Sequence, residues 1–363
     1  MAKRVGIDKW LFGSTLLLVL IGVLMVFSAS AVMAGEKFGS PYHFLLRQLG
    51  WAIAGMAAMA ALMNVDYRRW KNPGVVFTLL GLTTLLLVAV FFLDRSHNTH
   101  RWIKMGLMSF QPSELAKPAL ILFLAFFLEN RIRSIDDWRH TLLPAIVPAA
   151  MFCLLIVKEP DLGTAVVCLA ITAVVLYTAG MRLRYFAYSL IPIVPAITYL
   201  LVFVPWRLAR VKVFLNPNSD PQGAGFHIYQ SLIAVGTGGL TGLGLMEGKQ
   251  KLFYLPEPHT DFIFAVVGEE LGLIGALAIV VLFLIFAWRG LRTALRSHDP
   301  FARLLAVGIT TMVIVQAFFN VSVVLALLPT KGIPLPFISY GGSSLFVMLA
   351  SVGVLLNISQ QAE

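Results

Sequence analysis

The sequence has little charge. Only 13% of its 363 residues are Asp, Glu, Lys or Arg, whereas a typical soluble domain has about 25%. Apolar runs recur from one end of the chain to the other, and 58% of the residues are hydrophobic. The mean hydropathy is +0.83. This pattern excludes an ordinary soluble domain and indicates a membrane protein that crosses the bilayer many times.

Cysteine is also scarce. The chain has two, Cys153 and Cys168, and both lie inside apolar segments. This excludes a disulfide framework and a cysteine-based metal site, and we expect both to be small buried hydrophobic side chains. A basic face and an aromatic–basic motif are missing too, so the net charge of +10 does not indicate nucleic-acid binding.

A transmembrane helix needs about 20 mainly apolar residues. The first apolar run follows a basic start, MAKRVGIDKW, but it is too long for a cleavable signal peptide, so we expect it to stay as a span. We predict an all-α fold in a single transmembrane domain, 1–363, with ten spans near 10–34, 44–64, 74–93, 113–129, 141–157, 162–180, 185–204, 262–288, 303–328 and 342–358.

The distribution of Lys and Arg predicts the orientation of these spans. Basic residues are concentrated in short segments on the side of the N-terminus, for example at 68–71, 131–139 and 289–303. Many of those on the other side fall in the loop 205–261, which is too long to carry much topological weight. We therefore expect both termini in the cytoplasm, and the loop 205–261 and the start of the eighth span outside.

Two segments of the long loop have a local interpretation. GTGGLTGLG, 236–244, lacks the Gly-Lys-Ser/Thr ending of a phosphate-binding loop, so it predicts turns and close backbone packing. FHIYQSLIAV, 226–235, predicts a short helix at the membrane interface.

Ionisable residues at membrane depth are candidates for function because they are costly in lipid. Arg47, near the outer end of the second span, either extends to the headgroups or contacts an anionic ligand. In the fourth span Gln111, Glu114 and Lys117 recur every three residues and share one helix face. A structural Glu–Lys tie would explain this pair, but we favour a charged cavity that opens outward.

Further acids lie at the outer ends of later spans. In KEPDLGTA, 158–165, a solvated turn with Asp161 capping the sixth helix is an adequate explanation. LPEPHTDFIFAVVGEELGLIG, 255–275, has Asp261 at the start of the eighth span and Glu269 roughly 12 Å deeper. Glu269 and Glu270 cannot both face lipid, so at least one must point into the bundle.

A late segment, LPTKGIPLPFISYGGSSL at 328–345, cannot continue a helix because of its prolines and glycines. Non-helical backbone beside a membrane normally lines a cavity or is buried in protein. We interpret this segment as a wall for a polar ligand, to which Lys331, Ser339 and Ser343 contribute.

Five segments together resemble the signature sequences of the SEDS family of shape, elongation, division and sporulation proteins. They are QPSELAK, EPDLGTA, DPQGAGFHIYQS, LPEPHTDFIFAVVGEELG and PTKGIPLPFISYGGSSL. KQKLFYLPEPHTDFIF and LLPTKGIPLPFISYGG are more similar to the division branch of this family, whereas DPQGAGFHI has some character of the elongation branch.

The resemblance implies a peptidoglycan glycosyltransferase that polymerises lipid II at the outer face of the bacterial cytoplasmic (inner) membrane. It also implies work with a class B penicillin-binding protein, which is a transpeptidase, and with other membrane proteins of the divisome.

By the same resemblance, the essential acid of the family matches Asp261, and polar cavity residues match Glu114 and Lys117. An α-linked donor that yields a β-1,4 bond requires inversion in one displacement. We expect Asp261 to take the proton of the acceptor's GlcNAc 4-hydroxyl, with its pKa raised by low-dielectric surroundings. His259 and Thr260 are expected to shape those surroundings, and Glu269 and Glu270 to serve packing or cavity polarity.

The leaving diphosphate needs positive charge. The candidates are Arg210, Lys117, Arg47, Arg101 and Lys331. No His/Asp/Glu cluster with metal-ligand spacing is visible, so we assign no metal ligands, and a divalent cation stays an open alternative. Two other functions are open as well: a lipid II flippase, whose passage would need the same polar residues, and a scaffold, which poorly explains an outward acid beside a polar cavity.

Overall fold

The computed structural model describes residues 6–94, 101–105, 108–216, 223, 225–252, 254–329 and 332–362. It is mainly helical, and every predicted span coincides with one long helix, which confirms the fold class. These helices are α1 (Lys9–Phe38), α2 (His43–Asn64), α3 (Pro73–Leu93), α4 (Pro112–Glu129), α5 (Leu143–Lys158), α6 (Leu162–Thr178), α7 (Leu183–Val202), α10 (Ile263–Arg296), α11 (Pro300–Val324) and α12 (Gly342–Ser359).

Within the described residues, seven helices are long and apolar enough to cross a membrane. They are α1, α2, α3, α5 together with the preceding η3 (Trp138–Leu142), α10, α11 and α12. Helix α6 is apolar but shorter, and α4 carries three charged side chains in 18 residues, Glu114, Lys117 and Glu129. The chain is therefore a multi-pass membrane protein.

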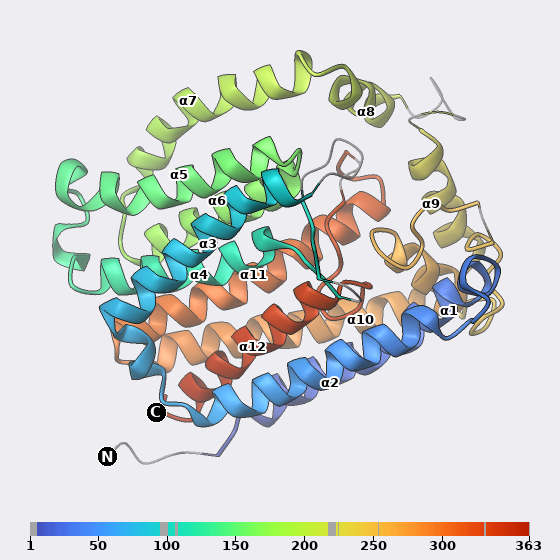
Figure 1. Ribbon diagram of the computed structural model, residues 1–363, viewed down its shortest axis with the longest axis horizontal. Helices are drawn as coiled ribbons and strands as arrows, with labels where there is room; N and C mark the ends of the chain where they lie inside the picture. The colour runs from blue at the N-terminus through green and yellow to red at the C-terminus, as the bar shows by residue number, and fades with distance from the viewer. Residues whose placement is uncertain are drawn as a thin grey trace.

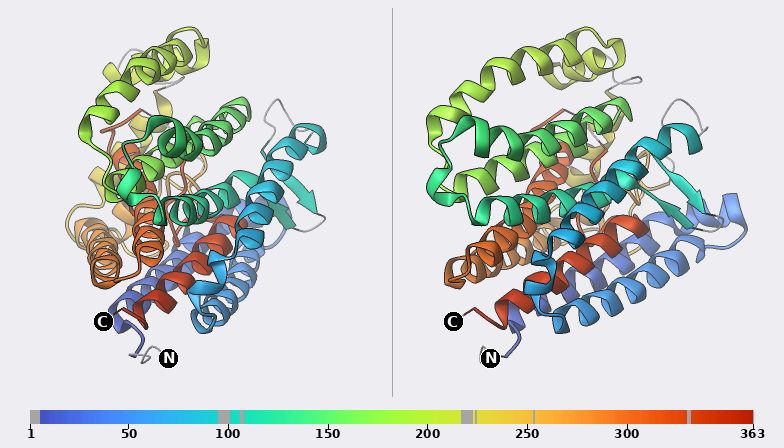
Figure 2. Two further views of the ribbon diagram at one scale, coloured as in Figure 1. Left: turned by 90° about the vertical axis from the view of Figure 1, so that its left-hand side faces the viewer. Right: turned by 60° about the vertical axis from the view of Figure 1, so that its left-hand side comes forward.

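Shorter elements lie between these helices. They are η1 (Tyr67–Lys71), η2 (Ile132–Ser134), α8 (Pro205–Leu215), α9 (Phe226–Thr237), and the antiparallel strands β1 (Ile103–Met105) and β2 (Met108–Phe110). Helix α9 confirms the helix expected at 226–235. Helix α8 and the strand pair were not predicted. The strands lie at the end of the bundle where α1 passes to α2 (Figure 2).

The two termini lie at one end of the bundle, and α8 and α9 lie at the other (Figure 1). This arrangement agrees with an even number of crossings. Helices α11 and α12 are the most buried of the seven apolar helices, whereas only 22% of the apolar stretch is buried in α2, α3 and α10. Helix α7 runs along the edge of the molecule (Figure 1), and none of its described side chains is buried. The centre of the fold is therefore α11 and α12, with α4 and α6 packed against α11.

Two of the predicted spans differ from the observed helices. The ninth was expected to reach 328, but α11 ends at Val324, and Ala326 adopts a positive φ of 53°. The eighth was expected to be continuous, but α10 is broken at Gly272, where φ is 65° and ψ is −165°. A residue with a side chain rarely adopts such a conformation, so glycine permits this break.

The break in α10 is filled by the backbone of the Gly-rich run 236–244. Leu243 N donates to Glu269 O at 3.0 Å, and Leu273 N donates to Gly239 O at 3.0 Å. A buried helix end needs such partners for its free amides and carbonyls. The predicted close backbone packing of this run is confirmed, and its partner is the part of α10 around Gly272, 269–274.

Candidate functional site

Asp261 lies in the turn directly before α10. Its own carbonyl oxygen accepts a hydrogen bond from Asn320 Nδ2 of α11 at 2.8 Å. The two preceding carbonyls, of residues 259 and 260, accept from Tyr340 N at 2.9 Å and from Ser339 Oγ at 2.6 Å. Three consecutive carbonyls are thus held by α11 and by the non-helical segment before α12, which fixes the position of the carboxylate.

The surroundings of Asp261 adjust its acidity. Burial raises the pKa of this carboxyl to about 7, and the negative charges of Glu257 and Asp161 act in the same direction. The guanidinium groups of Arg101 and Arg210 oppose this increase. The side chain still keeps partial access to solvent. A carboxyl that ionises near neutral pH and is accessible to solvent has the properties of a general base.

Arg101 is held in place by two loops. Its Nε donates to the carbonyl oxygen of Glu159 at 2.9 Å, and its Nη2 donates to that of Pro160. The Asp94 carboxylate accepts from Arg101 N at 2.9 Å and from Trp102 N at 3.1 Å. Arg101 therefore joins the ends of α3 and α5 beside Asp261.

Arg210 approaches Asp261 from α8. Its side chain is exposed, and its charge lowers the pKa of the carboxyl. Arg207, one turn earlier on the same helix, lies close enough to Arg101 for that charge to lower the Arg207 pKa, after burial as the first cause. Three arginines from two segments therefore concentrate positive charge near the candidate base.

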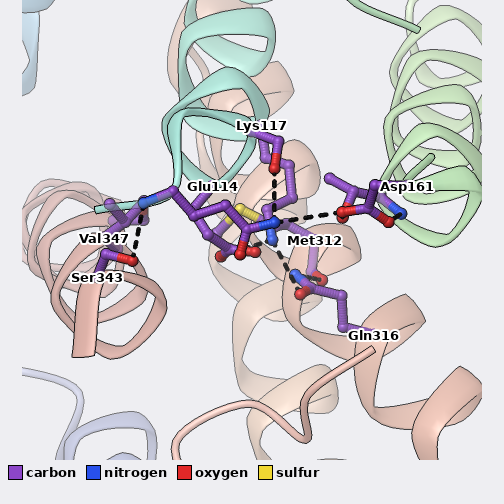
Figure 3. A network of polar contacts seen from close by, with 11 residues as sticks. Glu114, Lys117, Asp161, Met312, Gln316, Ser343 and Val347 are labelled. Carbon is purple, nitrogen blue, oxygen red and sulfur yellow. Dashed lines mark hydrogen bonds and ion pairs between the residues drawn. The ribbon is translucent and has the colours of Figure 1, made fainter. Parts of the chain in front are cut away.

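Glu114 and Lys117 form a buried ion pair (Figure 3). The Nζ–Oε2 distance is 2.8 Å, and Lys117 Nζ also donates to Gln316 Oε1 of α11 at 2.9 Å. Both charged residues are at most 2% exposed. The pair is thus a polar tie between α4 and α11. The outward-opening cavity that we favoured, and a substrate contact by this pair, stay predictions.

A second part of this network connects the start of α4 with the start of α6. Gln111 Nε2 donates to Asp161 Oδ2 at 3.2 Å, and Gln111 N donates to Ser343 Oγ at 3.3 Å. Asp161 also accepts from Thr164 N at 3.1 Å, which confirms it as the cap of α6. The expectation of a solvated turn is wrong, because the segment packs inside the protein and Glu159 and Asp161 are 0% and 5% exposed. Since the charge of Asp161 acts on Asp261, this network reaches the surroundings of the base.

Glu269 and Glu270 both point into the protein, and each is 1% exposed. Glu270 pairs with Lys251 Nζ at 2.6 Å, and its two oxygens accept from Ser28 Oγ at 2.8 and 2.6 Å. Glu269 Oε1 accepts from Lys249 N at 2.7 Å and from Gln250 N at 3.1 Å. We call Ser28, Lys251, Glu269 and Glu270 the acid clamp. It fixes the loop that precedes Asp261 to α1 and α10.

A polar cavity of about 260 Å³ lies beside the turn that carries Asp261. Arg47, His259 and Thr260, all predicted site residues, line it together. The other lining residues are Trp51, Trp102, Ser109, Glu257, Tyr340, Gly341 and Gly342. The two tryptophans were not predicted from the sequence. Trp102 offered a signal, since it lies between two spans, near a common place for Trp, but Trp51 lies two turns inside α2.

The remaining predicted residues divide into two groups. The hydroxyls of Ser339 and Ser343 are used inside the protein, in the bonds to Thr260 O and Gln111 N described above. Lys331 lies outside the described residues. Among the described residues, no group of three or more His, Cys, Asp or Glu side chains could hold a metal ion.

The chain is similar to characterised families along its whole length. The cell cycle protein family FtsW/RodA/SpoVE matches residues 8–363. A probable peptidoglycan glycosyltransferase FtsW of Geobacter metallireducens is 46% identical over 343 residues, which are 94% of this chain and 92% of the relative. Stage V sporulation protein E of Bacillus subtilis is 44% identical over 359 residues, 99% of this chain and 98% of the relative.

Solved structures agree with these relatives. A chain described under "Structural coordination of polymerization and crosslinking by a peptidoglycan synthase complex" has a TM-score of 0.79 and 30% identity, and 98% of both chains is covered. The rod shape determining protein RodA of Thermus thermophilus has a TM-score of 0.72 and 28% identity, with 99% of this chain and 98% of that chain covered. The chain belongs to the FtsW/RodA/SpoVE family, as the SEDS signature segments indicated.

Proposed function

We propose that this chain polymerises lipid II into β-1,4-linked glycan strands for the septal cell wall, at the outer face of the cytoplasmic membrane. Its class, peptidoglycan glycosyltransferase, follows from its family and from relatives that carry this name at 44–46% identity. The first of these relatives are named FtsW, which favours the division role over the elongation role of RodA, with the same chemistry in both.

The observation that carries the mechanism is the position of Asp261. It is a partly exposed carboxyl with a pKa of about 7, next to Thr260 of the polar cavity and near the positive charges of Arg101 and Arg210. In the proposed reaction the Asp261 carboxylate takes the proton of the acceptor's 4-hydroxyl as that oxygen attacks the anomeric carbon of the donor. The bond to the diphosphate breaks in the same displacement, so the α-linked donor becomes a β-linked product.

The leaving undecaprenyl diphosphate is stabilised by cations that are already in position. Arg101 is fixed by the carbonyls of Glu159 and Pro160 in the loop between α5 and α6, and Arg210 projects from α8 beside Asp261. Fixed positive charge at a developing anion lowers the barrier without reorganisation during the reaction. In this scheme Glu114, Lys117, Ser339 and Ser343 support the site from behind, through Gln111, Asp161 and the turn at 259–261.

The partner we propose is a transpeptidase of the class B penicillin-binding type. A solved relative is described as part of a complex that coordinates polymerisation with crosslinking. Glycan made at the outer surface is the substrate that a crosslinking enzyme needs, so a complex of the two would pass it on directly.

A test of the function must separate an enzyme from a flippase. Purified chain in detergent, without a membrane that separates two compartments, is incubated with labelled lipid II. The proposal expects long glycan chains on a denaturing gel, and lysozyme should degrade them. A protein that moves lipid II across vesicles but forms no glycan in detergent, alone or with its transpeptidase, would be a transporter.

A further inference from the structure

The polar cavity beside Asp261 has the composition of a carbohydrate site. Trp51 of α2 and Trp102 before β1 offer flat apolar rings, and Arg47 and Glu257 offer hydrogen-bonding groups of opposite charge. Sugar rings have apolar faces that pack on indoles through C–H contacts, and hydroxyls that need donors and acceptors. The volume of about 260 Å³ lies just under the range of about 300–1,000 Å³ of small-molecule pockets. It suits one sugar ring.

His259 supplies an independent sign of a ligand. It is 5% exposed, and its Nδ1 has no hydrogen-bond partner among the described residues. The ring lies 4.6 Å from that of Phe44 and 5.7 Å from that of Tyr340, measured between centroids. These aromatic contacts fix the imidazole at the cavity wall. A buried polar atom without a partner is costly, and a hydroxyl in the cavity would satisfy it.

Trp51 packs against the first residue of α12, Gly342. A Cβ added to Gly342 would lie 2.1 Å from both Cδ1 and Nε1 of the Trp51 indole. Only glycine therefore allows the indole to pack at this point of the cavity wall. Of the paired glycines that follow Tyr340, Gly342 thus makes space for an aromatic ring.

The cavity and the base are connected by neighbouring residues. Thr260 lines the cavity and precedes Asp261, and Trp102 lines it and follows Arg101. Glu257 lines the cavity and also raises the pKa of Asp261. Neither Arg101 nor Arg210 lines the cavity, although the charges of both act on Asp261. Asp261 does not itself line the cavity, but it follows Thr260, which does, and it lies near Arg101 and Arg210. The turn at 259–261 therefore borders two different regions: a sugar-sized cavity with one charge of each sign, and a cluster of arginines.

We infer that this cavity is the acceptor subsite, which holds the terminal GlcNAc ring between Trp51 and Trp102 with its 4-hydroxyl toward Asp261. The inference rests on the proposed function. In an inverting displacement the attacking oxygen and the leaving oxygen lie on opposite sides of the anomeric carbon. The leaving diphosphate requires the arginine cluster, so the uncharged acceptor ring occupies the other region.

The test separates the two substrates chemically. Lipid II with a 4-O-methyl GlcNAc lacks the attacking hydroxyl and acts only as donor. An analogue with a methylene group in place of the anomeric oxygen cannot release its phosphonate and acts only as acceptor. The full chain in liposomes then makes one bond per pair, and a KM is measured for each analogue with the other held in excess.

We expect Trp102→Ala and Trp51→Ala to raise the KM for the acceptor analogue about tenfold, with the donor KM changed less than about twofold. Trp51→Phe keeps a ring and should restore most of the affinity. Arg210→Ala should show the opposite pattern, with only the donor KM raised. The matched control is Trp138→Ala, since Trp138 is 55% exposed and lies in η3, far along the chain from the site.

A donor KM that rises as much as the acceptor KM in the tryptophan variants would overturn the acceptor assignment. Unchanged values for both analogues would do so too. If the wild-type chain forms no glycosidic bond, the proposed function fails instead. Binding of the acceptor analogue is then measured by saturation-transfer NMR. Equal binding by wild type and Trp102→Ala would contradict the acceptor subsite as well.

Discussion

The segment 255–275 contains two kinds of acid with opposite environments. The carboxylate of Asp261 is partly exposed, and among the described residues it accepts no hydrogen bond. Glu269 and Glu270, two turns further along the chain, are buried, and together they accept from an ammonium, a hydroxyl and three backbone amides. The carboxylate oxygens of Asp261 therefore have no hydrogen-bond donor among the described residues, whereas those of Glu269 and Glu270 have several.

This difference teaches how to separate a structural charge from a reactive one. A buried carboxylate with all its lone pairs satisfied gains nothing from accepting a proton, and it stabilises the loops that supply the donors. A carboxyl held by its backbone but left unsatisfied at its oxygens is ready to accept a proton from a ligand. The acid clamp holds the loop, and Asp261 is the group that the loop presents.

Asp261→Asn should have the largest effect on activity. It keeps the shape of the side chain but cannot take a proton, so polymerisation of purified lipid II should fall about 10²–10⁴-fold. The thermal unfolding midpoint in detergent should not fall, because the asparagine removes a desolvated charge. A variant that polymerises at the wild-type rate would contradict the role of this residue as base.

Glu270→Ala should have the largest effect on stability. It leaves Lys251, 6% exposed, without its partner, at a cost of about 3–5 kcal/mol. The measurement is the midpoint of thermal unfolding, with specific activity expressed per folded molecule. Glu247→Ala, an exposed acid of the same loop, is the control and should change neither. If the Glu270→Ala protein is as stable as wild type yet inactive, Glu270 takes part in the reaction rather than in the stability of the fold.

Glu257→Gln should shift the pH dependence. Its charge raises the pKa of Asp261, and the base must be ionised, so activity rises with pH through this pKa. Without the charge, the pKa falls and the acidic limb of the pH–rate profile moves to lower pH. Arg210→Gln removes a charge that lowers the same pKa, so its limb should move to higher pH. Identical limbs in the two variants would show that another group controls the profile.

Ser28→Ala should have the smallest effect. It removes one donor to Glu270, while the ion pair with Lys251 stays, so stability should fall by about 1 kcal/mol and activity should be unchanged. Ser30→Ala, which loses only a bond to Val26 O of its own helix, is the control on the same helix. If Ser28→Ala instead destabilises as strongly as Glu270→Ala, the hydroxyl rather than the ammonium is the main partner of this acid.

The helices and their order could be predicted from the sequence because they depend on local composition. The ten apolar runs correspond to ten helices, and the Gly-rich run predicted close backbone packing but not the segment against which it packs. The break at Gly272 could not be predicted, since a lone glycine is tolerated within many helices. Only the approach of the backbone at 239–244 makes the break favourable, and that approach is a tertiary contact.

The candidate base was found through its motif, but its surroundings were not. Ser28 and Glu270 are 242 positions apart in sequence, and no local pattern joins them. The cavity likewise combines Trp51, Trp102 and Gly342 from three distant segments. Glu114 and Lys117 were correctly placed on one helix face, but their burial depends on Gln316 of α11, which the spacing within α4 does not reveal.

The length of α10 sets how far apart the two ends of the protein lie. From Arg289, which pairs with Asp8 at the start of α1, to the break at Gly272 the helix extends about 26 Å at 1.5 Å per residue. This is close to the hydrocarbon thickness of about 30 Å. In the proposed orientation, the break and the acid clamp therefore lie near the outer boundary of the lipid tails. The part of α10 before the break then raises the turn that carries Asp261 toward the level at which the sugars of a membrane-anchored substrate stand.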